Sequence, residues 1–172
     1  MCYNYIIYLL YCIMIKKTIK RILKLGFVSG LSGVYGGIAK NQLRGVTLAV
    51  ERINKQGGVL GKQVKIIIKD DKSDPKLTTK LNREMIYQDK AHFLVGQLSA
   101  GTQIAANIEA KKAKMLFMSL GQTNELTIAP HLGPHTFHQT LTVHMTDQAV
   151  GKWIFENLGR KWYLIGPNYE YG

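Results

Sequence analysis

Hydroxyl, amide and glycine residues gather in three short stretches, each directly after a predicted strand. The stretches are 29–35, 97–102 and 119–123. Such side chains, with neighbouring backbone N–H groups, bind the oxygens of small polar molecules. Ser99 stands where a helix is predicted to begin, and from the residues alone its simpler role is to cap that helix, although the positive helix end can also accept an anion. The residues of these three stretches are the candidate binding residues.

Other residues with possible catalytic or metal chemistry have simpler explanations. Asp70, Asp71 and Asp74 fit a turn and a helix cap, whereas a hard-cation site needs more converging oxygens. Four histidines have no zinc-site spacing and no cysteine near them: His131, His135, His138 and His144. The glycine turn at 29–33 lacks the spacing and the lysine of a phosphate loop, and no Ser–His–Asp arrangement can be argued from spacing. We predict no catalytic residue, no metal and no cofactor.

The chain of 172 residues has a formal net charge of +12, unevenly distributed. Five basic residues fall in one stretch before the first acid, Glu51: Lys16, Lys17, Lys20, Arg21 and Lys24. Elsewhere the basic residues interleave with acids, as on an ordinary solvated surface. A nucleic-acid interface needs a basic face with base-reading partners, so we predict no nucleic-acid partner.

The first 21 residues form an apolar and basic segment that we predict to lie outside the fold. The apolar run Tyr5–Ile15 is too short to span a bilayer as a helix, and its lysines follow it, whereas a secretory signal places them before. A helix on a membrane surface is the alternative, because Ile15, Ile19 and Ile22 share one helical face. The only cysteines, Cys2 and Cys12, fall here, so no disulfide holds the remainder.

The remainder alternates strands with helices. Short apolar runs predict five strands, at 23–29, 64–68, 93–96, 115–118 and 162–165. Helices are predicted between them with apolar faces at helical spacing: Leu43, Val46, Val50 and Ile53; Leu77, Leu81 and Met85; Ile104 and Ile108; Val150, Trp153, Ile154 and Leu158. Asp74 caps the second helix, with Pro75 at its first position.

This alternation predicts a three-layer α/β/α fold, a Rossmann-like parallel sheet of about five strands covered by helices on both faces. Ligands of such sheets bind beyond the carboxyl ends of the strands. The first strand should be internal, because the loop after it must reach that edge.

Several longer motifs are similar to the type I periplasmic binding proteins, the branched-chain amino-acid receptor family. That family has L-S-G-x-Y after its first strand, then E-x-I-N-x-x-G-G-x-L-G, then D-D-x-S-D-P. This sequence has LSGVY at 31–35, ERINKQGGVLG at 51–61 and DDKSDP at 70–75. Later segments also resemble the family: GQLSAGTQ at 96–103, SLGQTNELT at 119–127 and GRKWYLIGPNYEYG at 159–172.

The resemblance implies a role for each matching residue. Ser99, with Ala100 beside it, matches the serine that binds the ligand carboxylate through its hydroxyl and backbone N–H. Gly121, Gln122 and Thr123 match a loop that offers a backbone N–H, a backbone carbonyl and a threonine hydroxyl. Two tyrosines complete the implied site: Tyr35, whose ring would wall the cleft, and Tyr171, near the hinge. Many relatives have a small residue where Gln122 stands, which argues against a branched aliphatic ligand.

The resemblance therefore implies the substrate-binding component of an ABC importer, for an amino acid or an amide-like solute, with a membrane permease as partner. Residues 22–172 would form the first lobe, truncated before the second lobe and before the segment that returns to complete the first. Apolar surface should then stay uncovered on one side. The family works in the periplasm or outside the cell envelope, although residues 1–21 do not resemble a signal. A flavodoxin-like enzyme or regulator is the alternative, because the sheet alone fits it too.

Overall fold

A five-stranded parallel sheet forms the centre of the protein, for which the computed structural model describes residues 22–163, 165–166 and 168. The strands are β1 (Leu23–Ser29), β2 (Val64–Asp70), β3 (Phe93–Gly96), β4 (Phe117–Ser119) and β5 (Thr136–His138). They lie in the order β2-β1-β3-β4-β5, and every neighbouring pair is parallel. The predicted parallel sheet with an internal first strand is confirmed.

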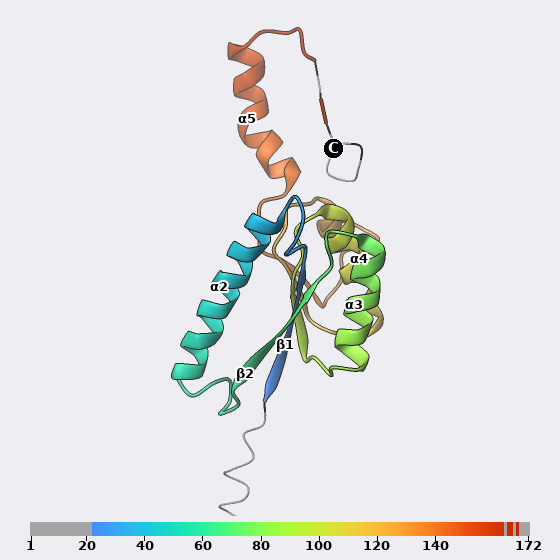
Figure 1. Ribbon diagram of the computed structural model, residues 1–172. Helices are drawn as coiled ribbons and strands as arrows, with labels where there is room; N and C mark the ends of the chain where they lie inside the picture. Colours follow the sequence, from blue (N-terminus) through green and yellow to red (C-terminus); the bar gives the residue numbers. More distant parts are fainter. Residues whose placement is uncertain (1–21, 164, 167, 169–172) are drawn as a thin grey trace, which may run out of the picture.

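Helices lie on both faces of this sheet (Figure 1). Helix α2 (Gly36–Lys55) lies on one face, and α3 (Pro75–Tyr87) and α4 (Ala100–Lys112) lie on the other. A short 3-10 helix, η1 (Glu125–Thr127), connects β4 to β5. The predicted three-layer arrangement is therefore confirmed.

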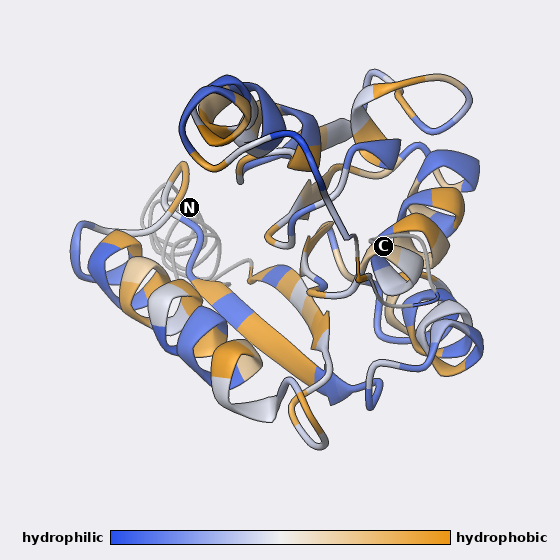
Figure 2. Cartoon of the chain, turned by 90° about the horizontal axis from the view of Figure 1, so that it is seen from above, coloured by the Kyte–Doolittle hydropathy of each residue, from blue (hydrophilic) through white to orange (hydrophobic). Residues whose placement is uncertain are grey.

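The two faces of β1 pack against different helices, because successive side chains of a strand point to opposite faces. Leu25 and Phe27 pack with Val50 of α2, whereas Val28 belongs to a second cluster with Met85 of α3. Viewed from above, the mostly apolar strands lie between the helices (Figure 2). At Gly26 a Cβ atom would come within 2.6 Å of the Met85 side chain, so glycine allows α3 to approach the sheet closely.

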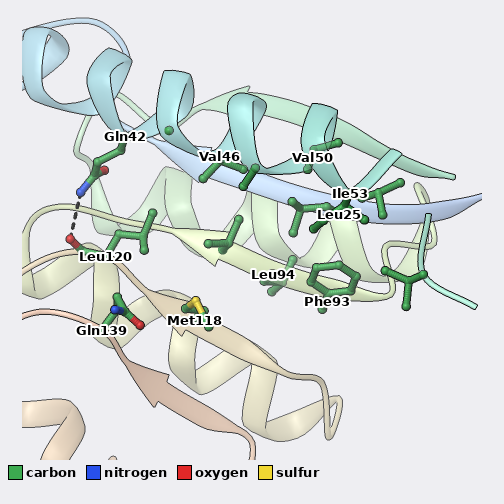
Figure 3. A pocket seen from close by; sticks show the side chains of 15 residues that line it. Leu25, Gln42, Val46, Val50, Ile53, Phe93, Leu94, Met118, Leu120 and Gln139 are labelled. Carbon is green, nitrogen blue, oxygen red and sulfur yellow. Dashed lines mark hydrogen bonds between the residues drawn. The ribbon is translucent and has the colours of Figure 1, made fainter. Parts of the chain in front are cut away.

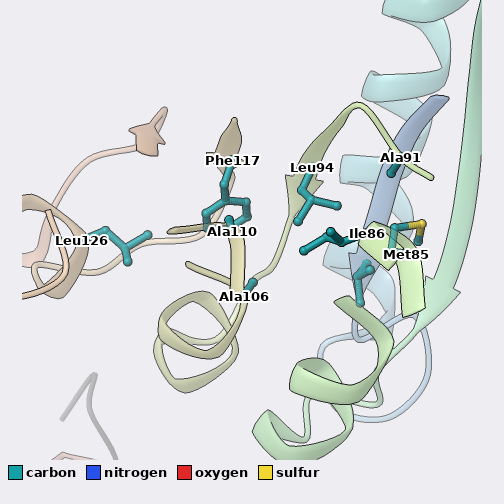
Figure 4. Close-up of a cluster of buried hydrophobic side chains, with 9 residues drawn as sticks. Met85, Ile86, Ala91, Leu94, Ala106, Ala110, Phe117 and Leu126 are labelled. Carbon is teal, nitrogen blue, oxygen red and sulfur yellow. The ribbon is translucent and has the colours of Figure 1, made fainter. Parts of the chain in front are cut away.

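The core between the sheet and helices α3 and α4 is almost completely closed to solvent (Figure 4). Met85, Ala106, Phe117 and Leu126 are each no more than 1% exposed. Helix α3 begins as predicted: Pro75 is its first residue, and the Asp74 carboxylate accepts the N–H groups of Lys76 and Leu77. Burial of this kind contributes about 25 cal/mol for each Å² of apolar surface.

The predicted inward face of α4 is wrong at Ile108, which is 39% exposed. The face turned toward the core carries small and polar residues instead: Thr102, Gln103, Ala106, Asn107 and Ala110. Small side chains let α4 lie close to the sheet and to α3, and the amides form hydrogen bonds there. Apolar periodicity cannot identify such a face.

The predicted C-terminal helix forms, but its predicted burial and the strand predicted after it are wrong. Helix α5 (Val143–Asn157) buries none of its residues and extends beyond the carboxyl end of the sheet (Figure 1). Val150, Trp153 and Leu158, expected to be buried, are all exposed. The described residues of the predicted strand 162–165 are exposed and not in a strand. The fifth strand is β5 instead, which lies in a stretch rich in Gly, Pro and His where no strand is predicted from the sequence.

An apolar groove of about 770 Å³ lies between α2 and the sheet (Figure 3). Val46 and Val50 line it from the helix, and Phe93, Met118 and Leu120 line it from the sheet side. Apolar surface was expected to stay uncovered on one side of the lobe, and Met118 is 41% exposed here. The Gln42 side-chain amide crosses one end of the groove and donates to the Leu120 carbonyl at 2.9 Å.

Residues 1–21 lie outside the described part of the chain. Across the part that is described, no helix combines the length and the apolar character needed to cross a membrane.

A buried carboxylate ties α3 to α4. Glu109 has a side-chain exposure of 4% and accepts hydrogen bonds from Arg83 at 2.8 and 3.1 Å. Lys112 adds a third contact at 3.0 Å. The hydrogen bonds from Arg83, helped by Lys112, hold the pKa of Glu109 below its ordinary value despite its burial.

The Glu109→Gln variant should lose about 1–2 kcal/mol of unfolding free energy at neutral pH, because it leaves Arg83 without its charged partner. Since the pKa of Glu109 is lowered in the folded state, its contribution is present at neutral pH and disappears as the pH falls through that lowered pKa. Urea unfolding of both proteins should therefore show a difference that shrinks in acid. Glu156→Gln, which removes an exposed pair with Lys152, should change stability by less than about 0.5 kcal/mol. A difference that is independent of pH would contradict this account.

Candidate functional site

The three stretches singled out from the sequence lie at one edge of the sheet. Strands β1, β3 and β4 are parallel, so their carboxyl ends meet at the same edge. The residues after them are Gly30–Tyr35, Gln97–Ser99 and Leu120–Asn124. Residues far apart in the sequence are therefore neighbours at this edge.

Ser99 is the N-cap of α4. Its Oγ accepts the Thr102 N–H at 3.4 Å and lies 3.0 Å from the Thr102 hydroxyl. Ala100, the first residue of the helix, is 1% exposed. The N–H groups of Ala100 and Gly101 have no acceptor within the helix, since the first turn of any helix lacks them. The cap and an anion site are compatible here, because the cap uses only one of these donors.

The Gln103 side chain joins the loop before α4 to the loop after β4. Its Nε2 donates to the Leu98 carbonyl at 3.1 Å and to the Gln122 carbonyl at 3.4 Å, while its Oε1 accepts from the Ser119 hydroxyl. Gln103 is fully buried. Gln103 is not among the predicted site residues, and the only signal for it in the sequence is an amide on a helix face where apolar residues are usual.

The two loops touch directly at Gly121. A Cβ atom there would lie 2.3 Å from the Leu98 carbonyl oxygen, so a side chain would push the loops apart. Thr123 is only 2% exposed, and its Oγ1 accepts the Glu125 N–H at 3.2 Å. Gln122 is half-buried and its Nε2 donates to the Thr146 hydroxyl at 3.2 Å. Five predicted residues therefore lie on two joined loops: Ser99, Ala100, Gly121, Gln122 and Thr123.

Tyr35 lies at the same edge, immediately before α2, and is half-buried. Its loop is held by Asp70 at the end of β2, which accepts the N–H groups of Leu31 at 2.9 Å and Ser32 at 3.4 Å. Burial raises the pKa of Asp70, but hydrogen bonds from Ser32, Lys72 and Leu31 outweigh it and hold that pKa below its ordinary value. Tyr171 lies outside the described residues.

Asp71 is turned into the protein rather than toward this edge. It is fully buried and accepts hydrogen bonds from the Ser73 N–H and the Thr78 hydroxyl, at 2.9 and 2.8 Å. Burial raises the pKa of Asp71 above its ordinary value. A phosphate-accepting aspartate would have to be accessible, so this geometry does not favour a flavodoxin-like regulator. Within the described residues, no three His, Cys, Asp or Glu side chains converge as a metal site would require.

Comparison with known proteins identifies a family. The sequence pattern of the family described as periplasmic binding protein matches residues 22–172. The chain belongs to this family. A Pseudomonas aeruginosa member, the leucine-, isoleucine-, valine-, threonine- and alanine-binding protein, is 34% identical over 133 residues, which cover 76% of this chain and 34% of that protein. The chain thus spans about a third of the length of this curated relative.

Solved structures show the same likeness. The branched-chain amino-acid transporter substrate-binding protein LivJ of Streptococcus pneumoniae, in complex with isoleucine, superposes with a TM-score of 0.72 at 27% identity. The match covers 80% of this chain and 39% of that one. A solute-binding protein of an ABC transporter from Rhodopseudomonas palustris, in complex with 3,4-dihydroxybenzoic acid, superposes with a TM-score of 0.69 at 25% identity. The match covers 79% of this chain and 36% of that one.

The Asp70→Ala variant should loosen the loop that carries Tyr35. Loss of hydrogen bonds to a charged acceptor should lower the unfolding free energy by about 1–2 kcal/mol, and the amides of Leu31 and Ser32 should exchange with solvent faster. Hydrogen exchange measured by NMR at neutral pH checks this. Asp147→Ala, on the exposed surface of α5, is the control and should change neither amide. Unchanged exchange in Asp70→Ala would show that the loop is held by other contacts.

Proposed function

We propose that this chain provides the first lobe of a substrate-binding protein of an ABC importer, and that it captures a small solute bearing a carboxylate. The proposal includes a membrane permease as partner, a site of action in the periplasm or outside the cell envelope, and no enzymatic activity or cofactor. One observation carries it: in a member of this family, the first turn of α4 and the loop after β4 are joined at the carboxyl edge of the sheet.

The proposed contacts follow from which groups lie at this edge. The Ser99 hydroxyl and the N–H groups of the first turn of α4 would bind the carboxylate, where the helix dipole adds to the hydrogen bonds. Gln122 and Tyr35 would border the rest of the solute. Thr123 would act through the loop that it stabilises, because its own side chain is almost fully buried.

Two relatives support a carboxylate as the common feature. Isoleucine and 3,4-dihydroxybenzoic acid, the molecules bound in the two solved structures, share a carboxylate and little else. An N–H site at a helix end recognises that group whatever the rest of the molecule is.

The proposal also includes the bounds of the first lobe. The packed part of the fold reaches Thr142, which is 9% exposed, and α5 after it buries nothing. We infer that residues 22–142 form the first lobe, a shorter range than the 22–172 expected from the sequence. Helix α5 would then belong to a second lobe. Closure of two lobes around a ligand is a hinge motion that removes the ligand from water.

The chain of 172 residues should bind its solute weakly, with a dissociation constant in the millimolar range. Only one side of the solute is contacted by the described residues, so the hydrogen bonds compete with water and add little net free energy. NMR titration of the purified chain against carboxylate-bearing solutes is the measurement. Micromolar affinity would show that one lobe suffices, and absence of any saturable shift would contradict the proposed function.

The Ser99→Ala variant should weaken this binding by about tenfold, because a hydrogen bond to a charged group is lost. It should also cost about 1 kcal/mol of stability through loss of the cap. Asp74→Ala, which removes the cap of α3, is the matched control: it should lose similar stability and retain the affinity. Equal affinities in the two variants would mean that Ser99 is a cap and nothing more.

A further inference from the structure

The carbonyl oxygen of Gly121, in the middle of the candidate site, already has two hydrogen-bond donors. The Thr140 hydroxyl donates at 2.7 Å, and His138 Nε2 lies at 2.9 Å. A carbonyl oxygen only accepts, so His138 must be the donor, whether neutral with the proton on Nε2 or charged. With two lone pairs and two donors, this carbonyl is saturated.

Both donors come from the segment at the end of β5, which lies over the carboxyl edge of the sheet beneath α5 (Figure 1). That segment is fixed at both ends. The Gln139 N–H donates to the Ser119 carbonyl at 3.1 Å, and the His144 N–H donates to Asn124 Oδ1 at 2.9 Å. The two donors are therefore held at Gly121 by the fold.

Four other carbonyls of the two loops also accept a hydrogen bond from a side chain. The Leu98 and Gln122 carbonyls accept from Gln103, the Leu120 carbonyl accepts from Gln42, and the Ser99 carbonyl accepts from the Thr102 hydroxyl. Residues 97–102 and 119–124 include no Asp or Glu. The first turn of α4, in contrast, keeps N–H groups without an acceptor in the helix. The first turn of α4 therefore offers donors to an anion, whereas the neighbouring Gly121 carbonyl has no lone pair left for a donor of the solute.

We infer that this lobe selects a carboxylate that carries no α-ammonium group, an organic acid rather than an amino acid. The inference rests on the proposed function and narrows its solute class. An ammonium group beside the carboxylate would bring donors to the Gly121 carbonyl, whose two lone pairs are already taken, and donors left without acceptors are unfavourable. An apolar carbon without a hydroxyl group in the same place brings no donor, so it needs no acceptor.

The test compares two solutes of one carbon skeleton, L-leucine and 4-methylpentanoate, which differ only in the ammonium group. Both are titrated into the ¹⁵N-labelled chain of 172 residues while the amides of Ala100 and Gly101 are followed. 4-Methylpentanoate should bind at least about threefold more tightly. Leucine binding equally well or better would overturn the inference and leave the proposed function intact. If neither solute gave a saturable shift, the proposed function would fail as well.

Variants near Gly121 distinguish an effect of its occupied carbonyl from a general preference of the chain for solutes with a net negative charge. Thr140→Val removes one donor at an exposed position, which frees a lone pair, so the preference for 4-methylpentanoate should fall toward one. Thr79→Val is the matched control, because it removes a hydroxyl that donates to the Pro75 carbonyl in α3, and it should keep the preference. His138→Leu, which removes the other donor, is the second variant and should also lower it. An unchanged preference in both site variants would overturn the inference.

Discussion

The rest of the structure depends on the parallel pairing of β1 with β2 on one side and β3 on the other. Seven residue pairs join β1 to β2 and four join it to β3. Because every pairing has the same direction, the chain must return across a face of the sheet after each strand, which places the helices on the two faces. The same direction brings all carboxyl ends to one edge. The binding edge is thus a geometric consequence of pairing direction, before any particular side chain is considered.

Polar side chains then fix the loops at this edge, and they do so from the rigid elements beneath. Asp70 at the end of β2 holds the loop after β1. Gln103 in α4 joins two loops, and Gln42 in α2 reaches the loop after β4. Each contact alone contributes only about 1 kcal/mol to stability, so these contacts matter mainly because they fix the positions of the loops. They orient backbone groups whose direction would otherwise vary with the motion of a surface loop.

Sequence patterns predict what depends on local order and miss what depends on distant partners. The cap at Asp74, the strand at 23–29 and the apolar stripe by which α2 packs on the sheet all follow from neighbours within a few residues, and all were found. Ile108 and Trp153 were expected to be buried from helical spacing alone, but spacing does not reveal whether another layer covers the face. β5 was missed because it has three residues, one of them His138, and only β4 defines it as a strand. Gln103 was missed because its role is visible only once the two loops are adjacent.

In the proposed site, different groups bind the carboxylate and set the selectivity. The resemblance therefore predicts the general chemistry of the site better than its selectivity. Backbone N–H groups at the start of α4 would bind a carboxylate in any sequence that folds this way, since the peptide supplies them. Selectivity then comes from groups that modify the neighbourhood of that carboxylate. Under the inference above, His138 and Thr140 would do so by occupying the Gly121 carbonyl, although neither would contact the solute. Such residues lie outside the familiar binding motifs, so a change in solute class can arise without any change in the motif itself.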